Sequence, residues 1–133
     1  MAFRRMHNLR SYYSASIPEF LNQSTHEILG IIHTNDGSAE TTIQQSNTWE
    51  AEVLILKSQL KNFTEGHIIF EYTIPRMGKR VDTVVLYRNI VFLLEFLNGV
   101  YKICNDGKLR FLVPEVNSSG EDLKSIFQDL CKI

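Results

Sequence analysis

The stretch that decides the fold is residues 67–97, which read HIIFEYTIPRMGKRVDTVVLYRNIVFLLEFL. Three runs within it, at 67–74, 81–87 and 90–97, are rich in β-branched, aromatic and leucine residues, a composition typical of strands. Pro75 ends the first run, and only short turns separate the three. Because strands joined by short turns pair side by side in opposite directions, the stretch predicts an antiparallel meander.

Two acidic residues, Asp82 and Glu95, interrupt these apolar strands. If the two residues between the later strands form a hairpin turn, Tyr87 faces Ile90, and the same register places Asp82 opposite Glu95 on one face. Two adjacent carboxylates repel each other unless a cation lies between them, and Mg²⁺ prefers oxygen ligands. The register therefore predicts a metal site at Asp82 and Glu95. The alternative is that both acids form ion pairs with the basic turn 76–80.

Three helices are predicted before the strands. A short helix within residues 12–23 is entered through Ser16, and the capping box Ser24-Thr25-His26-Glu27 opens a second helix over about 25–33. The strongest helical pattern lies in residues 40–62, where apolar residues recur with a period of 3.6. That stripe consists of Trp49, Val53, Leu56 and Leu60.

After the meander, the sequence predicts a connector at 98–108, a strand at 109–116 and an amphipathic helix opened by Ser119. The connector is barely long enough for the crossover that a parallel strand requires. Its shortness suggests either a trimmed fold or a sheet that a second copy of the chain completes.

The fold class predicted from this order is α/β, with α+β as the alternative. We expect one domain over residues 1–133, with 1–11 flexible. A mixed sheet would contain the central antiparallel meander at 67–97, flanked by the N-terminal helices and closed by the C-terminal helix. Since the two later strands are apolar almost throughout, we expect both faces of the sheet to be covered.

Composition narrows the functional classes. The chain has 133 residues, 44% of them hydrophobic and 22% charged, which excludes a disordered tail and a disulfide-stapled mini-protein. A net charge of −1 provides no overall field for nucleic acid or membranes, so local patches must carry any such binding. No segment has the apolar length of a membrane span or the form of a signal peptide. Cys104 and Cys131 share no metal-ligand spacing, which favours a reducing, cytoplasmic location.

The sequence resembles the N-terminal part of a bacterial family of large Schlafen-like DNA/RNA helicases of unknown biological role. The resemblance covers residues 10–97, and IPRMGKRVD followed by an apolar strand ending in Glu-Phe is its most specific piece. The other matching segments are Tyr12-Tyr13-Ser14, Glu27-Ile28-Leu29-Gly30, Gln44-Gln45 with Trp49, Phe70 to Asp82, and Val91 to Phe96. The domain of that family is similar to the PD-(D/E)xK restriction-endonuclease fold.

This resemblance implies that Asp82 and Glu95 are the two metal-binding acids of a phosphodiester-cleaving site. The lysine of the motif falls on Leu97, which can neither position nor deprotonate a water molecule. Arg80, expected opposite Leu97, would supply a cation but is a poor base, and Lys102 is a weaker substitute. We therefore expect a trimmed, degenerate nuclease-like domain with weak or absent hydrolysis.

Basic residues near the acids suggest contacts with phosphates. Arg76, Lys79, Arg80 and Arg88 outnumber the acids between residues 76 and 88, and phosphate contacts require such cations. The alternative is an ordinary solvated turn. Gly78-Lys79 lacks the earlier glycine and the following Ser or Thr of a phosphate-binding loop, so we expect no ATP binding.

Three functions stay open from the sequence. The first is a degenerate nuclease-like module that binds nucleic acid or a protein. The second is an active Mg²⁺-dependent nuclease, and the third is a structural homodimer that completes a truncated sheet. None of the three involves a membrane.

Overall fold

The computed structural model describes residues 10–37, 41–76, 78–97, 100–103 and 110–112. Its elements follow one another as β1 (Tyr13–Ser16), α2 (Ile17–Asn22), α3 (Thr25–Asp36), α4 (Ile43–Gln59), β2 (His67–Thr73), β3 (Arg80–Tyr87), β4 (Ile90–Leu97), β5 (Val100–Ile103) and β6 (Arg110–Leu112). The expected closing helix and the residues 1–9 lie outside the described part.

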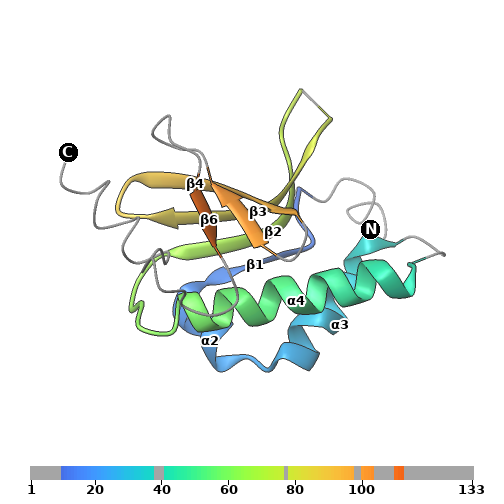
Figure 1. Ribbon diagram of the computed structural model, residues 1–133, viewed down its shortest axis with the longest axis horizontal. Helices are drawn as coiled ribbons and strands as arrows, with labels where there is room; N and C mark the ends of the chain where they lie inside the picture. Colours follow the sequence, from blue (N-terminus) through green and yellow to red (C-terminus); the bar gives the residue numbers. More distant parts are fainter. Residues whose placement is uncertain (1–9, 38–40, 77, 98–99, 104–109, 113–133) are drawn as a thin grey trace, which may run out of the picture.

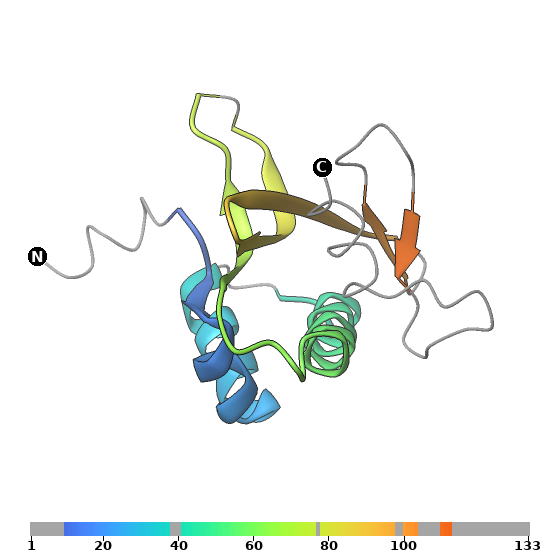
Figure 2. The same ribbon diagram turned by 90° about the vertical axis from the view of Figure 1, so that its left-hand side faces the viewer.

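The six strands form one sheet in the order β1-β2-β3-β4-β5-β6, and every described pair is antiparallel. The described helices lie together on one side of this sheet, with α4 crossing beneath the strands (Figures 1 and 2). The α/β class and the central antiparallel meander are therefore confirmed. The mixed sheet is replaced by an antiparallel one over the described strands.

Two strands differ from the sequence-based expectation. Tyr13–Ser16, expected at the start of a helical segment, forms β1 and pairs with β2 before the chain turns into α2 at Ser16. Val100–Ile103, expected within a connector, forms β5 and returns directly alongside β4. An antiparallel return needs only a tight turn, so the short segment at 98–108 requires no crossover helix.

Side-chain hydroxyls begin each described helix. Ser16, Ser24 and Thr42 each accept a hydrogen bond from the backbone N–H three residues later. Each bond satisfies one of the N–H groups that a helix leaves without an internal partner, which fixes where the helix starts. The expected helix starts at Ser16 and Ser24 are thereby confirmed.

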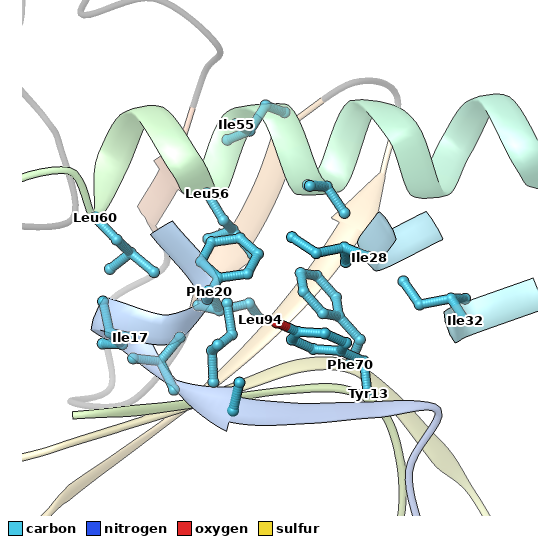
Figure 3. Packing of buried hydrophobic residues seen from close by; sticks show 14 of the residues in the cluster. Tyr13, Ile17, Phe20, Ile28, Ile32, Ile55, Leu56, Leu60, Phe70 and Leu94 are labelled. Carbon is cyan, nitrogen blue, oxygen red and sulfur yellow. The ribbon is translucent and has the colours of Figure 1, made fainter. Parts of the chain in front are cut away.

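The core lies between the helices and the sheet, where aromatic and aliphatic side chains interlock (Figure 3). Phe20 of α2 packs on Phe70 of β2 with ring centroids 5.8 Å apart. Lys57 ties α4 to this core, since its Nζ donates to the carbonyls of Phe20 at 2.7 Å and Gln23 at 2.5 Å. These carbonyls end α2, so the ammonium group satisfies acceptors that the short helix leaves open.

The opposite face of the sheet is less covered than the sequence predicts. Val84 is buried there, but Leu86, Val91 and Leu93 are exposed, Val91 to 54%. Coverage of both faces is thus met only in part among the described side chains. No described helix is long and apolar enough to cross a membrane.

Candidate functional site

The hairpin between β3 and β4 has the register expected from the sequence. Tyr87 pairs with Ile90, and the pairing continues to Thr83 and Leu94. Arg88 and Asn89 both have positive φ, as a two-residue hairpin turn requires. The next position along the same register is that of Asp82 and Glu95, where the ladder stops.

At that point the side chain of Asp82, instead of a backbone carbonyl of β3, bonds to the backbone of β4. Its Oδ2 accepts a hydrogen bond of 2.7 Å from the backbone N–H of Phe96. The half-buried carboxylate thereby holds β4 where the regular ladder has ended. Glu95, by contrast, is exposed to solvent. The structure therefore places the two predicted acids on neighbouring strands, in different environments.

Glu71 of β2 joins them through an unusual backbone conformation. It lies between the paired positions Phe70–Thr83 and Tyr72–Val81, opposite Asp82, and its φ is 54°. A glutamate rarely adopts this left-handed conformation, and within a strand it breaks the normal alternation of side chains. As a result, Glu71 Oε1 accepts a hydrogen bond of 3.2 Å from Trp49 Nε1 on α4.

Glu52 of α4 contributes a fourth carboxyl group from below the sheet. It is 1% exposed, and its Oε2 has no hydrogen-bond partner among the described residues. Burial raises its pKa to about 9, and the neighbouring charges of three acids add to this rise. Those acids are Asp82, Glu71 and Glu95. We call these four residues the acidic cluster.

The donor set of the acidic cluster suits a hard divalent cation, because carboxylate oxygens are the ligands that Mg²⁺ prefers. The unpartnered Oε2 of Glu52 is the kind of buried acceptor that a cation would satisfy. However, no three His, Cys, Asp or Glu residues in the described ranges stand close enough together to hold a metal ion. The carboxyl groups therefore fit a cation in chemistry, without forming a closed cage.

A polar cavity of about 300 Å³ opens beside the acidic cluster. Its lining includes Tyr12, Asp36, Gln45, Trp49, Glu71 and Arg80, and we call it the Tyr12 cavity. The guanidinium carbon of Arg80 lies 4.3 Å from the centroid of the Tyr12 ring, within the range of a cation–π contact. Arg80 is exposed and forms no ion pair with a described carboxylate.

The predicted basic residues fall into two groups. Arg76 and Lys79 belong to the turn between β2 and β3, which projects away from the helices in both views (Figures 1 and 2), and Arg80 is the first residue of β3. Arg88 follows the far end of β3, roughly 25 Å away for eight residues of strand. There, its Nε forms an ion pair with Glu65 at 2.8 Å. A common phosphate-binding patch would therefore consist of the first three without Arg88.

The backbone also places Leu97, the position at which the resemblance implies a lysine. Leu97 pairs with Val100 at the end of β4, and Lys102 of β5 stands directly opposite Glu95. In an antiparallel ladder, opposed residues belong to one face of the sheet. Of the two proposed substitutes, Lys102 thus shares a register position with an acid of the cluster, and Arg80 instead contacts Tyr12.

Sequence reasoning did not single out Glu52 and Glu71 as site residues. Glu52 follows Trp49 by three positions, so it falls on the buried side of the apolar stripe, which was a usable signal. The positive φ of Glu71 left no such signal, because nothing in the composition of the strand requires it.

Comparison with known proteins found no matching family model, curated protein or solved structure.

Proposed function

We propose that this chain is a degenerate nuclease-like domain that binds nucleic acid, with phosphodiester hydrolysis weak or lost. The observation that carries the proposal is the buried carboxyl group of Glu52, whose Oε2 has no hydrogen-bond partner among the described residues, beside Asp82 and Glu95. A carboxyl group in this position costs stability, and a structural role does not require it. A binding site that is built for a cation or for the substrate around a cation explains why the group is there.

The order of elements supports the same proposal. One helix followed by three antiparallel strands, α4-β2-β3-β4, supplies one acid from each element: Glu52, Glu71, Asp82 and Glu95. A divalent cation bound there would polarise a phosphoryl oxygen and lower the pKa of a bound water molecule. Asp82 and Glu95 are the two residues that would hold it, since no three of the described acids stand close enough together to form a metal site.

Arg76 and Lys79 provide the contacts with nucleic acid in this proposal. Both are exposed at the projecting turn between β2 and β3, and the hydrogen bond of 2.8 Å from the Ile74 N–H to the Lys79 carbonyl holds that turn closed. Such cations bind phosphates with a strength that falls as salt rises. Weak hydrolysis follows from leucine at position 97, which offers no proton donor or acceptor to a water molecule.

The test combines binding and cleavage. Fluorescence anisotropy with single- and double-stranded DNA and RNA oligonucleotides should show binding that weakens with salt, and R76Q/K79Q should reduce it by about tenfold. Binding that is insensitive to this double change would contradict the proposed surface. Cleavage with Mg²⁺ or Mn²⁺ should be slow or undetectable. Robust cleavage that Asp82→Asn abolishes, while Glu50→Gln on the exposed side of α4 does not, would overturn the degenerate assignment.

An active nuclease is the second candidate, favoured by the position of Lys102 opposite Glu95. It predicts that Lys102→Met abolishes cation-dependent cleavage, and calorimetry that detects no binding of Mg²⁺ or Mn²⁺ would exclude it. The homodimer stays a prediction, although β5 occupies residues 100–103 of the segment on whose shortness that hypothesis is based. Light scattering over a range of concentrations tests it independently.

A further inference from the structure

The Tyr12 cavity has an uneven distribution of charge. Asp36 and Glu71 contribute half-buried carboxyl groups to its lining, and the exposed Arg80 supplies a cation on the solvent side. An occupant would therefore need hydrogen-bond donors at its inner end and an anionic group at its outer end. A phosphate would be repelled from the interior, so the charge itself would orient such an occupant.

The two inner carboxyl groups are held by neighbouring donors. Asp36 Oδ2 accepts a hydrogen bond of 2.8 Å from Thr41 Oγ1, and the Tyr12 hydroxyl also bonds to Asp36. Glu71 Oε1 is held by Trp49 at 3.2 Å. Carboxylate oxygens accept hydrogen bonds, so a ligand that fits between them needs hydrogen-bond donors.

Arg80 is held in place on the outer side by its contact with the Tyr12 ring, 4.3 Å from the ring centroid. It has no ion pair with a described carboxylate. Burial raises the pKa of Glu71, and the charge of Arg80 acts against this larger effect. A planar guanidinium group matches the oxygens of a phosphate in a bidentate arrangement. The outer end of the cavity thus favours a phosphate.

We propose that the Tyr12 cavity binds a single unpaired nucleotide, with its base inside and its phosphate on Arg80, and that it prefers guanine. Guanine presents an imino and an amino donor side by side, which one carboxylate can accept together. Uracil flanks its single imino donor with two carbonyl oxygens, which a carboxylate repels, and adenine places an acceptor beside its amino group. The inference rests on the proposed function, since it names the substrate element that would lie next to the acidic cluster.

The experiment uses the full chain and nucleoside 5′-monophosphates in EDTA, so that neither a cation nor a polynucleotide is involved. Trp49 is the only tryptophan, is buried and lines the cavity, so its fluorescence reports on occupancy. We expect GMP to bind at least about tenfold more tightly than UMP or AMP, because unpaired acceptors in a site reject the wrong partner. Equal binding of GMP, UMP and AMP, or no response from Trp49, would overturn the proposal.

Matched variants separate the two ends of the ligand. Glu71→Gln preserves an acceptor for Trp49, and Asp36→Asn is a second, separate variant. Each of the two should reduce the preference for GMP over UMP by about tenfold. Arg80→Gln should weaken GMP binding about tenfold and leave guanosine binding unchanged. Arg88→Gln, at the far end of β3, is the control and should change neither. L-arginine, which is also rich in donors, should not compete; competition at similar concentrations would overturn the assignment to a base.

The experiments distinguish a failure of the cavity proposal from a failure of the proposed function. GMP binding without oligonucleotide binding would refute the nucleic-acid role and retain the cavity as a nucleotide site. Oligonucleotide binding that depends on Arg76 and Lys79 without any response to GMP would leave the proposed function intact and refute the cavity.

Discussion

The two ends of the molecule are built on different principles although one helix, α4, spans both. At the closed end, on the left of Figure 1, α4 ends at Gln59 with Leu60 as its C-cap, and Gly66 lies close to Ile17 and Tyr87. At the open end, α4 begins at Ile43 with Thr42 as its N-cap, and the Tyr12 cavity and the acidic cluster lie along its course. The closed end stabilises the fold through tight apolar contacts, whereas the open end places buried polar groups where they reduce stability. Such a difference is typical of a scaffold that carries a site.

Unusual backbone conformations at the two ends illustrate the contrast. Gly66 has φ of 110°, and a Cβ there would lie 2.9 Å from the Leu86 carbonyl oxygen, so only glycine fits that close approach. Glu71 has φ of 54°, a conformation that glycine adopts more easily than glutamate. In this conformation its side chain reaches Trp49. The first conformation serves packing, and the second places a carboxyl group next to Trp49.

The largest expected effect is the loss of apolar packing at the closed end. Leu60 is fully buried, so Leu60→Ala should lower the free energy of unfolding by about 2–5 kcal/mol, measured by urea denaturation. Leu54→Ala, at an exposed position on the same helix, is the control and should change it by less than about 0.5 kcal/mol. A small effect at Leu60 would mean that the apolar end does not carry the stability.

The next prediction concerns Glu52, which should make the open end a source of pH-dependent instability. Because its pKa is raised to about 9 in the folded state, the folded protein holds a proton that the unfolded chain releases above its own, lower pKa. The stability that the folded state gains from holding this proton is fully present at low pH and is lost as pH rises toward 9. Between pH 5 and pH 8 in EDTA, the unfolding free energy of Glu52→Gln should therefore rise relative to that of the wild type by roughly 3–4 kcal/mol.

The control for this prediction is Glu50→Gln, since Glu50 is exposed on the same helix. Its unfolding free energy should follow that of the wild type across the pH range. If the curves of the wild type and Glu52→Gln run parallel, the carboxyl group of Glu52 is not buried in solution, and the contrast between the two ends is weaker than the structure indicates.

The closed end was the more predictable of the two from the sequence. A two-residue turn fixes the register of β3 and β4, and the stripe from Trp49 to Leu60 identifies the buried side of α4. Local patterns sufficed there because apolar periodicity and packing agree. Opposite positions for Asp82 and Glu95 followed from the same register, which the described ladder follows as far as Thr83 and Leu94.

At the open end, local signals disagree or are absent. Glu52 is charged, and burial of a charge is costly, so composition assigns it to the surface although its spacing from Trp49 places it on the buried side of α4. Glu71 lies in a strand composition that gives no sign of a positive φ. β1 was missed because Tyr13–Ser16 is short and rich in small residues, and its strand conformation depends on pairing with β2.

A smaller effect is expected at the start of α4. Thr42 Oγ1 accepts a hydrogen bond of 3.0 Å from the Gln45 N–H, so Thr42→Ala should cost about 1 kcal/mol of unfolding free energy. Hydrogen exchange should show faster opening in the first turn of α4, with the Leu60 end unchanged. Thr48→Ala, which removes a hydroxyl bonded within the same helix, is the control and should have a smaller effect. If the first turn of α4 and its Leu60 end stay equally protected from exchange after Thr42→Ala, the first turn does not open independently of the rest of the helix.

The smallest effect tests whether charge contributes to the closed end. Arg88 and Glu65 form an ion pair of 2.8 Å, but their side chains are 63% and 55% exposed. Because water and salt screen such a pair, Arg88→Gln should change the unfolding free energy by less than about 0.5 kcal/mol. A double-mutant cycle with Glu65→Gln at low and high salt measures the coupling directly. A coupling above about 1 kcal/mol that survives high salt would show that this end depends on charge as well as packing, and the two ends would then differ in burial rather than in kind.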